Sequence, residues 1–176
     1  MSVPALAIAF QGAARTVTGS RHRLRFGPRS WLFDCGLYQG HRDEADRVNR
    51  AFAFEPAELE GAVVSHAHLD HSGNLPTLVR QGFRGPIHLT PATADLARPM
   101  LADSAFLMER DLEHVNRRQR EKRQPARKPL YRPADVVPTL ERFTPHDYRA
   151  PWPPAEGVTV TFGDAGHILG SATATF

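Results

Sequence analysis

One hexapeptide constrains this chain more than any other feature of its sequence. His66-Ala67-His68-Leu69-Asp70-His71 places four side chains that commonly bind metal ions within six positions. It follows Ala62-Val63-Val64, a short apolar run typical of a strand that is buried on both faces. A solvated polar loop has no need of such a strand before it. We therefore favour a metal site at the C-terminal end of a strand over a polar surface loop.

The spacing within the hexapeptide divides its ligands between two metal ions. His66 and His68 are two residues apart, so in an extended segment their side chains point to the same side and can share one ion. Asp70 and His71 follow in a tight loop and cannot comfortably reach that ion, which implies a second one. A metal pair with a bridging hydroxide attacks phosphate or carbonyl groups, so hydrolysis is the expected reaction. Asp70 and His71 are the candidate catalytic residues.

The remaining histidines divide into one candidate ligand and a structural group. His167 lies in a glycine-flanked turn, where it would complete the His66/His68 ion to three protein ligands plus water. The spacing alone leaves a simple turn histidine equally open. Five others lack a second ligand at useful spacing and are expected to be structural: His22, His41, His88, His114 and His146.

Apolar periodicity around these motifs predicts an α/β (α+β) chain. Alternating residues predict three successive antiparallel strands near residues 6–10, 24–26 and 31–33, and further strands at 86–89, 158–162 and 172–176. Helices are expected at residues 75–82, from 92 to about 123 with a kink or restart at Pro99, and at 134–142. Residues 124–133 carry three prolines and are expected to form an irregular loop.

Composition limits the chemistry and the cellular setting. Cys35 is the only cysteine, so no internal disulfide forms and any metal must be held by His and carboxylates. These ligands suit Zn²⁺ first, with Mn²⁺ or Fe²⁺ as competitors. No run approaches the roughly 20 apolar residues needed to span a bilayer, and the apolar start at residues 3–10 lacks the features of a signal peptide. We therefore expect a cytoplasmic protein without a membrane segment.

Four motifs succeed one another along the chain: Gly12-Ala13-Ala14-Arg15-Thr16-Val17-Thr18-Gly19-Ser20, Phe33-Asp34-Cys35-Gly36, the hexapeptide, and Gly166-His167-Ile168-Leu169-Gly170-Ser171. Together they resemble the metallo-β-lactamase superfamily, and within it the β-CASP branch of nucleases that process RNA or DNA. The resemblance implies an αββα sandwich. It also implies that His66, His68 and His167 bind one zinc ion, that Asp70 and His71 bind a second, and that Asp34 orients the site from behind the ligands.

The chain departs from the family pattern after the third metal motif. The family's metal-bridging aspartate would fall beyond Phe176, and the inserted β-CASP domain and a late histidine that completes the second metal are also missing. We therefore expect residues 1–176 to be the N-terminal portion of a metallo-β-lactamase domain, as a truncated protein or a fragment. Such a chain would bind at most one zinc tightly and show little or no nuclease activity alone.

A basic segment offers a further candidate contact with nucleic acid. Between Arg110 and Arg132 basic residues outnumber acidic ones, and they include Arg117-Arg118, Lys122-Arg123 and Arg127-Lys128. Such a cluster could track a phosphate backbone. Long helices commonly carry charged outer faces, however, and no aromatic residue is available to stack on bases before Tyr131. The sequence therefore favours a solvated face.

Three functions remain open. A zinc-dependent phosphodiesterase acting on RNA is favoured by the ordered motifs, with DNA as the competing nucleic acid and the mode of cleavage, endonucleolytic or exonucleolytic, undecided. A small-molecule hydrolase of the same fold, such as a thioesterase or lactonase, is the first alternative, because fold does not determine substrate. A catalytically silent truncated metal-binding module is the second. Metal identity and oligomeric state are not decided by the sequence.

Overall fold

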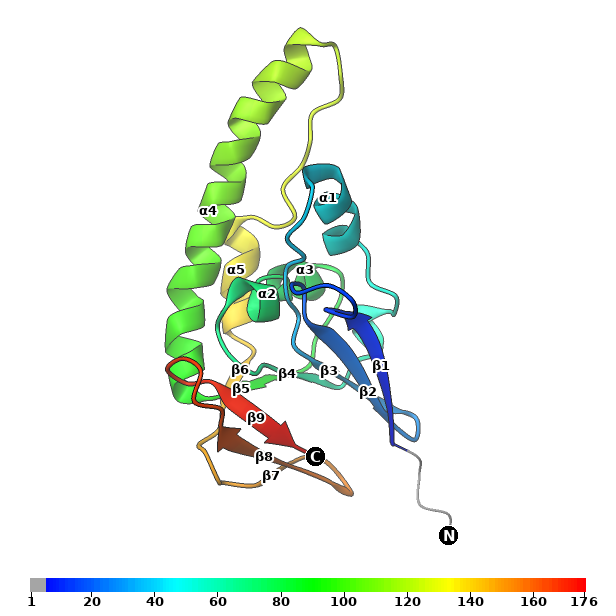
Figure 1. The fold of residues 1–176 in the computed structure, drawn as a ribbon, viewed down its shortest axis with the longest axis vertical. Helices are drawn as coiled ribbons and strands as arrows, with labels where there is room; N and C mark the ends of the chain where they lie inside the picture. Colours follow the sequence, from blue (N-terminus) through cyan, green and yellow to red (C-terminus); the bar gives the residue numbers. More distant parts are fainter. Residues whose placement is uncertain (1–5) are drawn as a thin grey trace.

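Two β-sheets pack face to face, and the helices lie on the outer side of the larger sheet (Figure 1). The structure is a computed structural model that describes residues 6–176. The larger sheet has the strand order β1-β2-β3-β4-β5-β6 and the smaller one the order β7-β8-β9. The strands are β1 (Leu6–Gly12), β2 (Arg21–Phe26), β3 (Arg29–Phe33), β4 (Gly61–Val63), β5 (Ile87–Leu89), β6 (Phe143–Pro145), β7 (Trp152–Ala155), β8 (Val158–Asp164) and β9 (Ala172–Thr175).

The pairing of the strands confirms the antiparallel start predicted from the alternating residues. β1, β2 and β3 are antiparallel neighbours, whereas β3 to β6 pair in parallel. β8 and β9, the two strands predicted around the turn that carries His167, pair antiparallel. The parallel strands have their C-terminal ends on the same side of the sheet, and the hexapeptide lies on that side, shortly after β4.

The helices form a single layer on the larger sheet, and a hydrophobic core lies between that layer and the sheet. They are α1 (Arg42–Arg50), α2 (Leu69–Ser72), α3 (Leu75–Arg80), α4 (Pro91–Glu121) and α5 (Pro133–Leu140), with a 3₁₀ turn at Pro56–Glu58. The core beneath them includes Leu32, Leu78 and Phe83, each fully buried. None of the helices among residues 6–176 has both the length and the apolar character needed to cross a bilayer.

β4 is buried on both faces, as its apolar run predicts. Ala62 and Val64 belong to the core under the helices, whereas Val63 packs between the two sheets against Val160 and Phe162. A strand in this position needs apolar side chains on each face. Three layers of the expected four-layer sandwich therefore lie within residues 6–176: helices, large sheet and small sheet.

The sequence predicted a kink or a restart of the helix at Pro99, and the restart does not occur. α4 is assigned as one helix of 31 residues with Pro99 inside it. Pro99 lies on the exposed face, so water can reach the backbone carbonyl that its missing N–H would otherwise pair with. Ala97 and Leu101 are buried on the opposite face and hold the helix against the body. Packing of this face outweighs the local cost of the proline.

Two strands and two helices escaped the sequence prediction. One is α2, which contains Asp70 and His71 where a tight loop was expected, and the other three elements have weak patterns. β6 ends in Pro145, and β7 contains Pro153 and Pro154. Both strands lie at sheet edges, where proline is tolerated because one side of the strand needs no ladder hydrogen bond. α1 has no apolar stripe of useful width and buries only Asn49 among its residues.

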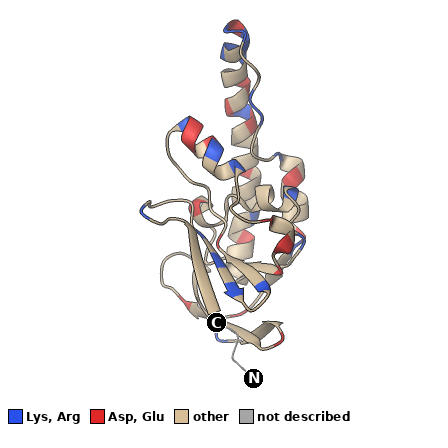
Figure 2. Cartoon of the chain, turned by 90° about the vertical axis from the view of Figure 1, so that its right-hand side faces the viewer, with Lys and Arg blue, Asp and Glu red and all other residues tan. Residues whose placement is uncertain are grey.

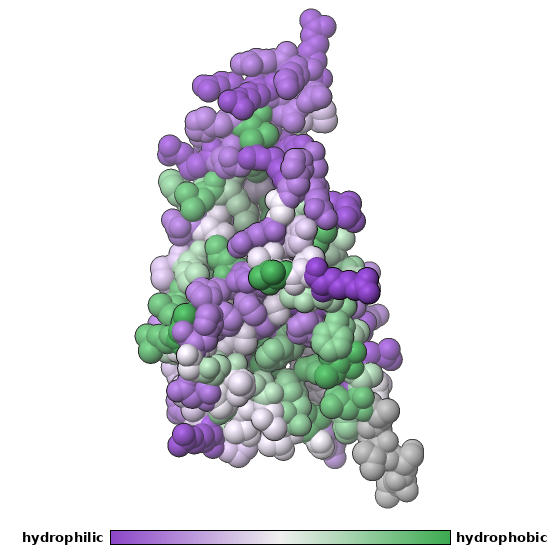
Figure 3. All heavy atoms as spheres, viewed as in Figure 1, coloured by the Kyte–Doolittle hydropathy of each residue, from purple (hydrophilic) through white to green (hydrophobic). Residues whose placement is uncertain are grey.

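An apolar surface remains uncovered at the other edge of the large sheet. β1 is the edge strand, and its side chains Leu6, Ile8 and Phe10 are at least half exposed. Together with Phe176 they border two shallow hollows between the sheets. Figure 3 shows this apolar area low on the molecule, opposite in character to the hydrophilic upper end.

Replacing Pro99 by alanine is expected to stabilise the protein. The change restores one helical hydrogen bond and removes a proline whose place in a helix interior costs up to about 3 kcal/mol. The unfolded chain gains freedom when the proline is removed, and this offsets about 1 kcal/mol of the stabilisation. We expect the free energy of unfolding in urea to rise by about 1–2 kcal/mol. Pro91→Ala is the control, because Pro91 stands in the first turn, where its ring costs little. A loss of stability in Pro99→Ala would contradict this account of α4.

Candidate metal centre

Four segments bring the candidate ligands to one place. Ser65, His66 and His68 lie in the turn after β4, and Asp70 and His71 lie in α2. His167 comes from the turn between β8 and β9, about a hundred residues further along the chain, and Asp34 from the turn after β3. The large sheet and the small sheet each contribute, so the centre lies where the two meet.

Three imidazoles face one another at metal-binding distances. His66 Nε2 lies 3.2 Å from His68 Nδ1, which in turn lies 3.3 Å from His167 Nε2. Among residues 6–176 this is the only group of three side chains arranged to hold an ion. A tetrahedral zinc ion with bonds of about 2.0–2.1 Å separates its ligand atoms by about 3.3–3.4 Å. The spacing of these nitrogens therefore fits a metal ion of this size.

The cluster is closed on one side and open on the other. His66 is only 7% exposed, whereas His167 lies on the surface. Three protein ligands with one side facing solvent match the open geometry of catalytic metal sites, in which the fourth position takes water or substrate. The arrangement can accept a bound molecule without displacing a protein ligand.

A relay of hydrogen bonds sets the orientation and tautomer of His66. Ser65 Oγ donates its one proton to Asp34 Oδ2 at 3.1 Å. The 2.9 Å contact between His66 Nδ1 and Ser65 Oγ must then be donated by the imidazole N–H. His66 Nε2 is left as the basic nitrogen, aimed at the other two histidines. Such supporting contacts fix ligand geometry and raise the basicity of the ligand.

Asp34 serves both halves of the candidate centre. Its buried carboxylate accepts hydrogen bonds from Ser20 Oγ, from the backbone N–H and hydroxyl of Ser65, and from His71 Nδ1 at 2.7 Å. The bond to His71 leaves Nε2 of that ring free, facing Asp70 Oδ2 at 3.7 Å. Asp34 therefore orients His66 through Ser65 and orients His71 directly.

The backbone around Asp34 is held in register with α2. Asp34 has φ +59°, a conformation that Asp adopts more readily than most residues. Cys35 N donates to His71 O at 2.7 Å, and Leu37 N donates to Leu69 O at 2.8 Å. A Cβ at Gly36 would lie 1.6 Å from the carbonyl oxygen of Asp70, so only glycine allows this approach.

The turn that carries His167 is fastened by hydroxyl groups. Ser171 Oγ accepts hydrogen bonds from the backbone N–H groups of His167 and Ile168. Thr90 and Thr93, at the start of α4, both donate to the carbonyl of Gly170. Sequence reasoning missed these supports, although Thr90 before Pro91 carries the signal of a helix N-cap. They attach the His167 turn to the helix layer.

Electrostatics separate the two neighbouring histidines His66 and His71. Burial, with a contribution from the nearby charge of His71, lowers the pKa of His66 to about 4. His66 is therefore neutral at pH 7, the form that binds a metal. Burial also works against charge on His71, but the hydrogen bond and charge of Asp34, with Asp70, outweigh it and raise the pKa of that ring.

The five histidines expected to be structural lie outside the three-histidine group. His88 Nδ1 lies 2.8 Å from His146 Nε2, and the His146 ring stacks on Trp152 at 4.0 Å. His114 contacts the carbonyl of Arg110 one turn earlier in α4. Each of these contacts occupies the ring in packing or in a local hydrogen bond.

Residues 29–169 match the family described as the metallo-beta-lactamase superfamily. The chain belongs to this superfamily. It is 39% identical over 161 residues to ribonuclease TTHA0252 of Thermus thermophilus. The aligned region covers 92% of this chain and 32% of that protein. It is 29% identical over 167 residues to transcription termination factor FttA of Methanocaldococcus jannaschii. Here the aligned region covers 95% of this chain and 24% of that protein. The recognition made from the four motifs is confirmed by these relatives.

Solved structures confirm the α/β fold class and the metallo-β-lactamase fold. A Cronobacter sakazakii metallo-beta-lactamase with a HARLDQ motif matches with a TM-score of 0.55 at 18% identity, over 94% of this chain and 49% of that one. The subclass B3 metallo-beta-lactamase MEM-A1, from a soil metagenome library, matches with a TM-score of 0.56 at 15% identity, over 99% and 55%. The chain thus spans about a third or less of the curated relatives and about half of these structures.

Replacing Asp34 by asparagine is expected to weaken metal binding without unfolding the turn. Asparagine tolerates the positive φ, but it removes the charge and puts an NH2 donor in place of Oδ2, the oxygen that accepts from the Ser65 hydroxyl and from His71. We expect the affinity for Co²⁺, monitored by its visible absorption, to fall about 10–100-fold. Asp95→Asn, a change of an exposed carboxylate on α4, is the matched control. Equal affinities in the two variants would show that Asp34 does not support the centre.

Proposed function

We propose that this chain is the metal-binding part of a zinc-dependent nuclease that hydrolyses phosphodiester bonds of RNA. The observation that carries the proposal is the cluster of His66, His68 and His167 in a chain 39% identical to a ribonuclease over 161 residues. In this proposal residues 1–176 correspond to the N-terminal portion of the metallo-β-lactamase domain, and the protein acts in the cytoplasm. DNA is the competing substrate.

We propose His66, His68 and His167 as ligands of the first zinc ion. Their nitrogens already face one another at the separations such an ion needs, and the relay through Ser65 holds His66 ready. Asp70 and His71 are proposed for a second ion, because the free Nε2 of His71 faces the Asp70 carboxylate. When bound, zinc supplies a water made nucleophilic near neutral pH and a positive charge for phosphate oxygens.

The chain's own residues contribute orientation and charge control. Asp34 keeps the two metal-facing rings in one tautomer, so neither has to rotate when substrate binds. Asp70 and His71 are partly exposed beside the cluster and can approach a phosphodiester placed there. The exposed turn of His167 leaves room for a long polyanion to enter from solvent.

The two alternative functions predict different outcomes in the same assays. A small-molecule hydrolase would keep its metal and cleave a thioester or lactone faster than RNA. A catalytically silent metal-binding module would keep the first ion and cleave neither class of substrate. The solved β-lactamase structures support the fold and do not favour either alternative, since their identity to this chain is under 20%.

The number of ions held by the chain tests the ligand assignment. Only Asp70 and His71 remain for a second ion among the described residues, so we expect one tightly bound zinc ion per chain after dialysis, measured by elemental analysis. His167→Ala should lose that ion, because two ligands remain. Asp70→Asn should retain it and is the matched control. Two ions that survive dialysis would contradict the assignment.

Hydrolysis of labelled RNA tests the catalytic role of the cluster. We expect slow cleavage by the chain alone and a loss of about 100-fold or more in His68→Ala, because removing a ligand exceeds the effect of removing a supporting contact. Zinc content should fall in the same variant. His114→Ala, a change on the exposed face of α4, should leave both quantities unchanged. Cleavage that survives in His68→Ala would refute the assignment of this centre to catalysis.

A further inference from the structure

The outer half of α4 extends beyond the body of the molecule (Figure 1). All of its buried residues lie between Thr93 and Ala105, and none comes later in the helix. Of the remaining sixteen residues of the helix, Met108 is partly buried against the core, and none beyond it belongs to a core cluster. A helix is stabilised in a protein mainly by packing of an apolar face, so this extension needs another explanation.

Residues 117–132, which we call the basic arm, comprise the end of α4 and the segment that returns toward α5. They hold eight of the chain's 22 Lys and Arg but one of its 19 Asp and Glu. Outside the arm acidic residues therefore outnumber basic ones, 18 to 14, although the whole chain has a net charge of +3. The positive charge of this protein is local. The basic residues are Arg117, Arg118, Arg120, Lys122, Arg123, Arg127, Lys128 and Arg132.

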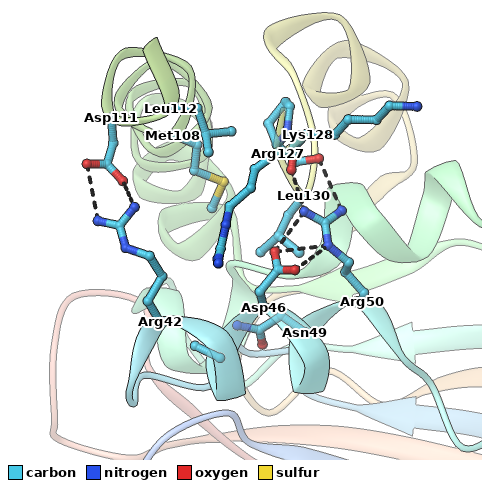
Figure 4. Close-up of a pocket in the computed structure, with 12 residues that line it drawn as sticks. Arg42, Asp46, Asn49, Arg50, Met108, Asp111, Leu112, Arg127, Lys128 and Leu130 are labelled. Carbon is cyan, nitrogen blue, oxygen red and sulfur yellow. Dashed lines mark hydrogen bonds and ion pairs between the residues drawn. The ribbon is translucent and has the colours of Figure 1, made fainter. Parts of the chain in front are cut away.

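Most of this charge is free to bind another molecule. Within the part of the chain that the structure describes, only Arg127 of these eight has a carboxylate in ion-pair contact, at 2.6 Å from Asp43. The base of the arm differs, because there Arg42 pairs with Asp111 and Arg50 with Asp46 (Figure 4). Charge is neutralised near the body and left unpaired beyond it, where Figure 2 shows the exposed end of the helix.

The arm is an ordered structure in which two segments run side by side. Asn116 donates to the carbonyl of Arg127 at 3.0 Å and accepts from its backbone N–H at 2.7 Å. These two bonds fix the return segment beside α4. The hollow between them measures about 470 Å³, and its basic side chains are Arg120, Arg127, Lys128 and Arg132, with Glu109 and Glu113 toward the body.

We propose that the basic arm is a docking site for the phosphate backbone of RNA, remote from the metal centre. The sequence alone favoured a solvated face, but the structure adds unpaired charge, a fixed pair of segments and an extension without a core. Arginine, which supplies six of the eight basic residues, binds phosphate with two parallel hydrogen bonds. Phosphate neutralisation needs no aromatic stacking, so the scarcity of aromatic residues is consistent with sequence-independent binding.

The position of the arm sets the length of RNA that can use it. α4 begins beside the His167 turn, where Thr90 and Thr93 bind Gly170, and rises about 1.5 Å per residue. Arg117 is therefore about 40 Å from the start of the helix. At about 3.4 Å per nucleotide in a helical strand, some 12 nucleotides cover that distance. A long RNA can therefore span from the metal centre to Arg117, whereas a four-nucleotide RNA cannot.

The test is direct binding of RNA, and it rests on the proposed function only for the identity of the substrate. Fluorescence anisotropy with a 30-nucleotide single-stranded RNA is measured in a His68→Ala background, in which cleavage does not disturb binding. The arm variant carries Arg117→Gln, Arg120→Gln, Arg123→Gln and Lys128→Gln, all exposed positions. The control removes the same charge elsewhere through Arg25→Gln, Arg47→Gln, Arg80→Gln and Arg149→Gln, also exposed.

We expect the arm variant to bind the 30-nucleotide RNA at least about 10-fold more weakly at low salt. Loss of four phosphate contacts should reduce the slope of log affinity against log salt by about 3 for a single strand. The control variant should change by less than about 3-fold, and a variant with Arg117→Lys, Arg120→Lys and Arg123→Lys that retains Lys128 should keep binding.

Several outcomes would overturn the assignment of the basic arm to RNA binding. These are an unchanged affinity and salt slope in the arm variant, an equal loss of affinity in the control, or no RNA binding by the parent His68→Ala chain. Competition by polyglutamate as effective as by RNA would identify a site for acidic protein and overturn the RNA assignment. Failure of the proposed nuclease is distinguishable, since RNA binding at the arm would then persist while zinc-dependent cleavage is absent.

Discussion

The buried carboxylate of Asp34 is the contact on which the rest of the candidate centre depends. A charged group at 2% exposure is costly unless its oxygens are fully used, and here they accept hydrogen bonds from two serines, a backbone N–H and His71. Those partners come from three separate places: the residue before β2, the turn after β4, and α2. Satisfying one buried charge therefore brings together the start of β2 and the ends of β3 and β4, and it orients the rings of the candidate ligands His66 and His71.

The sheet was predictable where local pattern and tertiary environment agree. Ala62, Val63 and Val64 are all apolar because β4 has neighbours on each face, so the run itself reveals the buried strand. β6 and β7 carry prolines that count against a strand by local rules, yet each lies at a sheet edge where the missing donor is unneeded. Whether a strand is an edge is a property of the assembled sheet, which no window of sequence contains.

The candidate centre divides in the same way. Close spacing in the sequence identifies four candidate ligands, because one short segment carries all of them: His66, His68, Asp70 and His71. His167 was equally a turn residue on spacing alone, and only the packing of the small sheet on the large one brings it to His68. Asp34 and His167 were assigned through family resemblance, while Ser65 was missed, because a serine becomes a relay only when a carboxylate and an imidazole meet on either side of it.

α4 runs from the His167 turn to the basic arm, and different contacts hold its two ends. At its start, the hydroxyls of Thr90 and Thr93 hold the His167 turn, and buried residues as far as Ala105 fasten the helix to the body. Pro99 falls within that fastened part, where packing compensates for a lost hydrogen bond. Beyond Met108 the helix joins no core cluster, and two hydrogen bonds from Asn116 hold the return segment beside it instead. The same helix therefore helps to position the candidate ligand His167 at one end and carries unpaired positive charge into solvent at the other.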